Sequence, residues 1–133
     1  MLEYTGIRVR DLERSRRFYT AGLGLVPGKT GRMSAGGVWL ELNDPESHAV
    51  LELNFYPDQP PYREGDELDH LGFVVGSVDE VTRRLIELGA RVRIPAFREG
   101  GSRLAFLSDP DGVWIELTER VRADEPPTSQ AVE

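Results

Sequence analysis

The chain contains the segment GIRVRDLERSRRFYTAGLGL at residues 6–25 and a related segment, GFVVGSVDEVTRRLIELGARV, at residues 72–92. Each is followed by strand-like sequence with a matched acidic motif, LEL at residues 51–53 and IEL at residues 115–117. The spacing is kept, since Gly6 and Gly72 are 66 residues apart and Glu52 and Glu116 are 64 apart. We therefore predict a pseudo-twofold protein of two similar halves, with a pocket where the halves meet.

Side chains alternate between the two faces of a strand, so the sequence also predicts which residues share a face. Apolar residues at every second position of the first and closing strands of each half should face the helices. The side chains between them should share the uncovered face, and include Tyr4, Glu52, His70 and Glu116. Either glutamate alone could be a solvated residue, and His70 could simply bind Asp69. Their matched positions in the repeat favour a functional site instead.

Length and composition indicate one compact domain. With 133 residues, of which 39% are hydrophobic, the chain is long enough for one core. It has no cysteine, which excludes disulfides, thiolate metal ligands and a nucleophilic cysteine. The start MLEYTG resembles no export leader and no apolar run could span a bilayer, so we expect a cytoplasmic protein without membrane contact. The net charge of −7 argues against nucleic acid as a partner.

Two helices are predicted. One follows Asp11, an N-cap residue, and runs to about Ala21. The other follows Ser77, which has capping-box spacing with Glu80, and ends at Gly89. Besides the first strand of each half, strands are predicted near residues 24–30, 36–43, 48–55, 91–95, 103–108 and 112–119. The order is therefore β-α-β-β-β, twice, in an α+β fold.

The boundaries follow from composition. We expect one domain over residues 1–119, made of two modules at about residues 1–56 and 68–119. Residues 57–67 are Pro-rich and acidic, and we interpret them as a connector rather than a flap over the pocket. Residues 120–133 have no apolar period and should form a disordered tail.

The doubled pattern resembles the vicinal oxygen chelate (VOC) superfamily, which includes glyoxalase I, extradiol dioxygenases and metal-free bleomycin resistance proteins. The likeness covers residues 4–119 and rests on the segments IRVRDLERSRRFYTAGLGL, HLGFVVGSVDEVTRRLIELGA and FLSDPDGVWIEL. It implies two tandem βαβββ modules that form a cup-shaped, mixed, eight-stranded sheet with helices on the outer face. One such fold hosts several chemistries, so the activity has to be argued from the site.

The resemblance implies four metal-ligand positions, which here hold Tyr4, Glu52, His70 and Glu116. Tyr4 stands where glyoxalase-like relatives usually have a histidine. A neutral phenol, which ionises at about pH 10, is a poor metal ligand. The other three suit a divalent ion such as Ni, Co, Zn, Mn or Fe. They are one histidine short of the ligand set of non-haem iron oxygenases, which disfavours an extradiol dioxygenase. His48 is too far along its strand to replace that histidine and should lie on the surface beside a turn.

The same resemblance implies roles in catalysis and substrate binding. A bound metal would polarise substrate oxygens and stabilise an enolate, with Glu52, or else Glu116, as the catalytic base. Arg8 stands where glyoxalases bind the glutathione carboxylate, but Tyr56 replaces a supporting asparagine, so glutathione specificity does not follow. The candidate substrate-binding residues are Arg8, Tyr4, Tyr56 and Trp114. Trp39 could line the pocket or pack in the core, and Glu41 has no assigned role.

Two functions remain open from sequence. The first is a glyoxalase-like, metal-dependent lyase or isomerase acting on a small carbonyl or thioester substrate. The second is a metal-free protein of the bleomycin resistance type that binds a small molecule in its cup. Retention of both glutamates and His70 favours the first, and Tyr4 favours the second. We expect a small-molecule ligand and a homodimer in either case.

Overall fold

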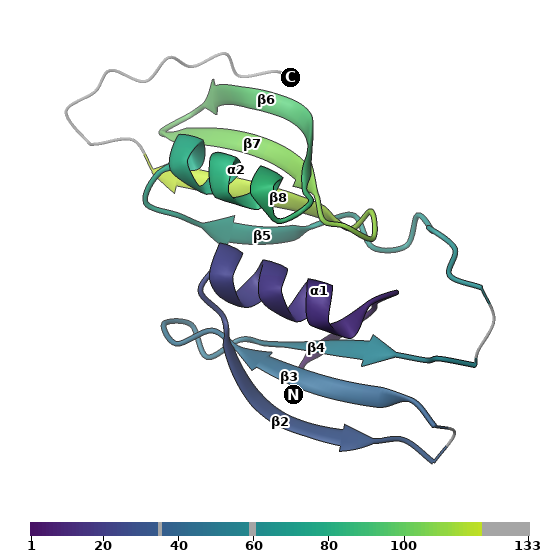
Figure 1. Cartoon of the computed structure of the whole chain (residues 1–133). Coiled ribbons are helices and arrows are strands. Elements are labelled where there is room, and N and C mark those ends of the chain that lie inside the picture. The colour runs from purple at the N-terminus through teal and green to yellow at the C-terminus, as the bar shows by residue number, and fades with distance from the viewer. Residues whose placement is uncertain (35, 59–60, 121–133) are drawn as a thin grey trace. The chain divides into compact units, whose positions relative to one another are not determined.

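The computed structural model describes residues 1–34, 36–58 and 61–120, which fall into two compact units, residues 1–64 and residues 65 onward (Figure 1). The first unit contains β1 (Thr5–Arg8), α1 (Leu12–Arg17), the π-helical turn η1 (Phe18–Gly22), β2 (Val26–Arg32), β3 (Val38–Asn43) and β4 (Val50–Phe55). Its four strands form one sheet in the order β1-β4-β3-β2. Strand β1 runs parallel to β4, and the other neighbours are antiparallel.

The second unit repeats this topology. It contains β5 (Leu71–Val74), α2 (Val78–Glu87), β6 (Arg91–Glu99), β7 (Ser102–Ser108) and β8 (Trp114–Arg120), with the sheet order β5-β8-β7-β6. Gly6 pairs with Glu52 in the first sheet, and Gly72 pairs with Glu116 at the same place in the second. The predicted β-α-β-β-β order is confirmed in both halves, and the eight strands divide equally between the two sheets.

The predicted alternation of faces is confirmed by burial. In the closing strands, Leu53, Ile115 and Leu117 are fully buried, whereas Glu52 and Glu116 between them are partly exposed. Each apolar face is covered by helical residues of its own unit. In the first unit these include Phe18 and Tyr19, and in the second Val78, Val81 and Leu85. Each unit therefore buries one face of its sheet, and its polar face is available for a site.

Both helix starts form as predicted. The backbone N–H of Arg14 donates to Oδ1 of Asp11 at 3.0 Å, and that of Glu80 donates to Oγ of Ser77 at 3.2 Å. These side chains satisfy amide groups that the first helical turn leaves without partners.

The end of the first helix differs from the prediction. The α-helix expected to reach about Ala21 ends at Arg17, and the chain continues as the wider turn η1 to Gly22. In this turn the Thr20 hydroxyl donates to the carbonyl oxygen of Arg16 at 2.8 Å. Phe18 and Tyr19 are adjacent in sequence, yet both are fully buried. A π-turn is specified by such packing rather than by helix propensity, so the apolar pattern alone did not indicate it.

Strand ends shift by a few residues, as expected when hydrogen bonding rather than composition defines them. The largest difference is β6, which continues to Glu99 rather than residue 95 and contains two register irregularities. Arg120, assigned to the tail, is the last residue of β8, and residues 121–133 lie outside the described part of the chain. Residues 57, 58 and 61–67 form no helix or strand. His48 is exposed in the turn before β4, as predicted, with a φ of 65°.

In the described residues, none of the helices has the length and apolar character that crossing a lipid bilayer would require.

Candidate functional site

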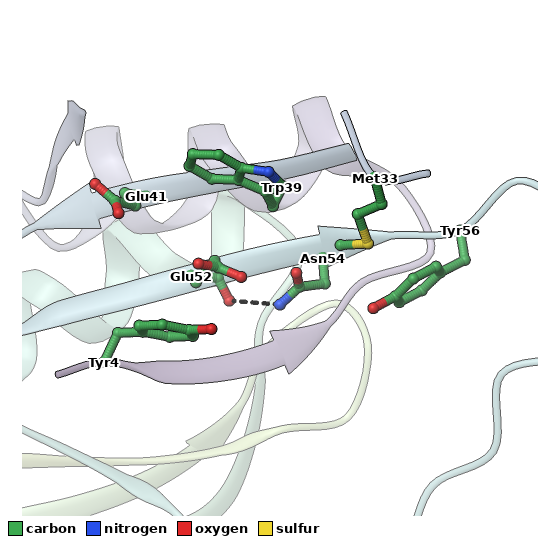
Figure 2. A pocket seen from close by; sticks show the side chains of 7 residues that line it. All are labelled: Tyr4, Met33, Trp39, Glu41, Glu52, Asn54 and Tyr56. Atoms are coloured by element: carbon green, nitrogen blue, oxygen red, sulfur yellow. Dashed lines mark hydrogen bonds between the residues drawn. The ribbon is translucent and has the colours of Figure 1, made fainter. Parts of the chain in front are cut away.

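A cavity of about 530 Å³ opens on the polar face of the first sheet (Figure 2). Its seven lining residues are Tyr4, Met33, Trp39, Glu41, Glu52, Asn54 and Tyr56. They come from β3, β4 and the segments next to β1, β2 and β4, so residues distant in sequence meet through strand pairing. The cavity combines two carboxylates with three aromatic rings.

The sheet register explains why these side chains meet. Glu41 of β3 lies directly opposite Glu52 of β4, and Trp39 lies opposite Asn54. Trp39 also pairs with Gly31 of β2, where an added Cβ would lie 2.6 Å from Cζ2 of the indole. The indole thus lies across β2 in space that only glycine leaves open. The position of this aromatic wall depends on a glycine in the neighbouring strand.

Glu52 has the properties of a basic carboxylate. Burial raises the pKa of the Glu52 carboxyl, and the negative charges of Glu41 and Glu3 raise it further, while Asn54 acts in the opposite direction. The Asn54 amide donates to the backbone carbonyl oxygen of Glu52 at 3.4 Å, which is a long hydrogen bond. A carboxylate with a raised pKa is a stronger base than one in water.

Two further candidates lie beside Glu52. Tyr4, 45% exposed, lines the cavity next to Glu52 and is drawn beside it in Figure 2. Arg8 pairs with Asn54 in the sheet, and its guanidinium carbon lies 5.5 Å from the centre of the Tyr56 ring. This geometry is typical of a cation–π contact. Tyr4, Arg8, Glu52 and Tyr56 are thus brought together in the first unit.

The second unit has its own group of polar side chains at the matched place. Nε2 of His70 lies 2.9 Å from Oε2 of Glu116, and its Nδ1 lies 2.6 Å from Oδ2 of Asp69. The hydrogen bond with Asp69 raises the pKa of His70, burial opposes this, and the charges of Glu116 and Asp69 add to it. The imidazole is therefore held between two carboxylates.

Aromatic residues surround this histidine. The ring of Phe106 meets His70 edge-on, with centroids 5.5 Å apart, and lies 6.2 Å from the ring of Trp114. Phe97 stacks on the same Phe106 at 6.4 Å. Trp114, predicted as a pocket wall, is 38% exposed and adjoins this cluster. The His70 and Glu116 pair consequently lies beside an apolar surface in its own unit.

The segment SDPDG before β8 positions Glu116. Oδ1 of Asp109 accepts hydrogen bonds from the backbone N–H groups of Asp111 and Val113, both at 2.9 Å. Gly112 completes the turn with a φ of 98°, a conformation that favours glycine. Asp109 and Asp111 are almost fully buried. We interpret this motif as a structural turn that fixes the start of the closing strand.

The donors present fit a divalent metal in chemical type. Among residues 1–34, 36–58 and 61–120, no three His, Cys, Asp or Glu side chains gather closely enough to hold an ion. The predicted ligands are two from each unit, and His70 and Glu116 already place a nitrogen and an oxygen donor side by side. Asp69 binds the other ring nitrogen, as the carboxylates behind metal-bound imidazoles do. Within the second unit, His70 and Glu116 thus offer a nitrogen and an oxygen donor of the kinds that borderline or hard divalent ions bind.

Residues 1–117 match the family described as the Glyoxalase/Bleomycin resistance protein/Dioxygenase superfamily. The chain belongs to this superfamily. It is 33% identical over 123 residues to a protein of Salmonella typhimurium named lactoylglutathione lyase, an alignment that covers 89% of this chain and 91% of that protein. It is 31% identical over 128 residues to a probable chloroplastic lactoylglutathione lyase of Arabidopsis thaliana, covering 90% of this chain but only 35% of the plant protein.

A solved structure supports the same assignment to the glyoxalase superfamily. The trypanothione-dependent glyoxalase I of Leishmania major is 29% identical, with a TM-score of 0.74, and the match covers 90% of this chain and 86% of that one. These relatives bear glyoxalase names, which agrees with a glyoxalase-like lyase more closely than with a drug-binding protein or a dioxygenase.

Some residues of this superfamily member went unrecognised in the sequence. Glu41, which had no assigned role, lines the cavity opposite Glu52. Trp39 proves to be a cavity wall rather than a core residue, and Asn54 and Met33 join it. Strand alternation places Asn54 on the same face as Glu52, but nothing in the sequence assigned it a role. Whether Glu41 lies opposite Glu52 depends on the register between β3 and β4, which cannot be read from the sequence.

The charged contacts of His70 predict that the stability of this glyoxalase-family protein, measured without metal, depends on pH. Because the folded-state pKa of His70 is raised above the unfolded value of about 6.5, its contribution to stability is complete below that pH. It is lost as the pH rises through the folded pKa. Urea unfolding in a chelator should therefore show that Asp69→Asn destabilises more at pH 6 than at pH 9. An equal loss of stability at both pH values would contradict a stabilising contact between charged His70 and Asp69. The control is His48→Asn, which changes a histidine in the exposed turn.

Proposed function

We propose that this protein is a glyoxalase-like, metal-dependent lyase or isomerase that moves a proton between adjacent carbons of a small carbonyl substrate. The observation that supports this most strongly is the pair of matched sites on the polar faces. Glu52 lies in a cavity, and the pKa of its carboxyl is raised. His70 and Glu116 lie at the equivalent place in the second unit. The lactoylglutathione lyase names of the relatives suggest a hemithioacetal, an adduct of a thiol with an α-ketoaldehyde, as the substrate class.

Glu52, His70 and Glu116 would hold the metal, and Tyr4 would line the site as a wall. A bound divalent ion would polarise the substrate oxygens and stabilise the enolate that proton removal creates. The donors would come from one chain or from two copies of a homodimer.

The chain's own residues have separate tasks. Glu52, released from the ion or held beside it, would remove the proton from the carbon next to the carbonyl and return it to the neighbouring carbon. The product is then an isomer, and no other reactant is consumed. Asp69 keeps the His70 ring in one orientation. Arg8, stacked on Tyr56, binds a negative group of the substrate. Trp114 and the neighbouring ring of Phe106 exclude water from one side of His70.

The test is metal binding followed by turnover. The protein, purified without a His-tag and stripped with a chelator, is titrated calorimetrically with Ni, Co, Zn, Mn and Fe(II). Hemithioacetals of methylglyoxal are then assayed with each ion that binds. We expect near-stoichiometric binding and metal-dependent turnover. Absence of binding by all five ions would contradict the metal-dependent reaction and would favour a protein that only binds small molecules.

A further inference from the structure

The cavity of the first unit has one acidic end, and this suggests the charge of the substrate. Resting on the proposed function, we propose that Glu41 is a specificity-determining residue that binds a positively charged ammonium group of the substrate. The natural substrate would then be an adduct of a thiol that bears an amine, rather than one whose thiol carries only negative groups.

The strand register defines the acidic end. Glu41 and Glu52 are direct partners on neighbouring antiparallel strands and line the same cavity. The Cβ atoms of directly opposite residues lie about 4.5–5.5 Å apart, and like charges in such positions repel. Figure 2 shows both carboxylates with Tyr4 at one end of the cavity, away from Met33 and Tyr56. A cation bound at this end would convert that repulsion into attraction.

The walls are suited to the same ligand. None of the seven lining residues is Lys or Arg, so no basic side chain of the lining neutralises the two carboxylates. Trp39 stands two residues from Glu41 on the same face of β3 and lines the cavity too. An indole face attracts organic cations more strongly than the other aromatic rings do. Carboxylates and an indole together form a surface that favours ammonium over carboxylate.

The second unit shows that this carboxylate is not required by the repeated fold. The residue opposite Glu116 in β7 is Phe106, at the place that Glu41 occupies opposite Glu52. The same backbone position thus accommodates an aromatic side chain in one half and a carboxylate in the other. Structural stability alone does not account for a charge at Glu41, because an opposing pair of glutamates costs free energy.

A positive charge lies beyond the Tyr56 end of the cavity, outside its lining, on the side chain of Arg8. In the sheet, Arg8 pairs with Asn54, and Asn54 pairs with Trp39. Asn54 and Trp39 lie two positions along their strands from Glu52 and Glu41. The guanidinium group of Arg8 stacks on the ring of Tyr56. A substrate with an ammonium group towards Glu41 and a negative group towards Arg8 would match both ends. If Glu52 coordinates a metal, the Glu41 carboxylate is still available to bind the ammonium group.

The experiment uses two probes of matched size, phenethylammonium and 3-phenylpropionate, titrated by calorimetry into the chelator-treated full chain. We expect phenethylammonium to bind at least about tenfold more tightly, because a charge-assisted hydrogen bond to a carboxylate is lost with the anion. Glu41→Gln should weaken phenethylammonium roughly tenfold and leave 3-phenylpropionate unweakened. The matched control is Glu46→Gln, which removes the same charge from an exposed turn of the same unit.

Each outcome decides the proposal. Equal affinities for the two probes, no binding of either, or equal effects of Glu41→Gln and Glu46→Gln would overturn it. The test requires no metal, so a Glu41-dependent preference in a protein that neither binds metal nor turns over hemithioacetals would contradict the proposed reaction alone. Conversely, metal-dependent turnover without this preference would contradict only the role of Glu41.

Discussion

Replacement of Glu52 by glutamine is expected to lower kcat by about 10²- to 10⁴-fold, the range that a positioned general base contributes. The amide would keep the size of the side chain but could not accept the substrate proton. Burial raises the pKa of the Glu52 carboxyl, which makes it a stronger base than a carboxylate in water. Turnover of a methylglyoxal hemithioacetal, measured at saturating metal, would separate this loss from weaker metal binding.

The control for this variant is Glu46→Gln, because Glu46 is exposed in the turn before β4. It should retain the parent kcat. The informative comparison is Glu116→Gln in the second unit. A Glu52→Gln variant with undiminished kcat, alongside a Glu116→Gln variant that loses it, would move the base to the second unit.

Replacement of His70 by alanine should weaken metal binding at least about 100-fold. This residue is the nitrogen donor of the proposed ligand set, and loss of a group that merely supports a metal ligand already costs about 10- to 100-fold. Asp69→Asn, which alters only the partner of Nδ1, should fall in that smaller range. Calorimetric titration of the stripped proteins with Ni and Zn measures both effects.

The chain has only two histidines, which provides a matched control. His48 lies in an exposed turn with a positive φ, so His48→Asn keeps a residue that tolerates this backbone conformation. It should bind metal like the parent. Metal affinity unchanged in His70→Ala, or lowered equally in both variants, would exclude His70 as a ligand.

The βαβββ repeat and the face of each closing strand could be predicted from the sequence because they depend on local patterns. Ile7 and Val9, or Ile115 and Leu117, alternate with polar residues, and burial rewards only one phase of that alternation. The helix starts at Asp11 and Ser77 were equally local, since each cap binds an amide three residues away. The resemblance to the superfamily rested on these same segments.

Other features required information that no local pattern contains. The wide turn at Phe18 and Tyr19 exists because both rings are buried, and helix propensity does not encode that packing. The added length of β6 depends on pairing with β7 across two irregularities. Trp39 lines the cavity because strand pairing places it opposite Asn54 on one side and Gly31 on the other.

The sequence by itself determined the two-module fold, the superfamily and the candidates Glu52, His70 and Glu116, because periodicity and repeat spacing are properties of the chain. Only the tertiary structure decided that Glu41 opposes Glu52 and that His70 lies between Asp69 and Glu116. The physical reason is that strand register and side-chain contact are set by hydrogen bonding and packing between distant segments. Those interactions are satisfied together only in the folded protein.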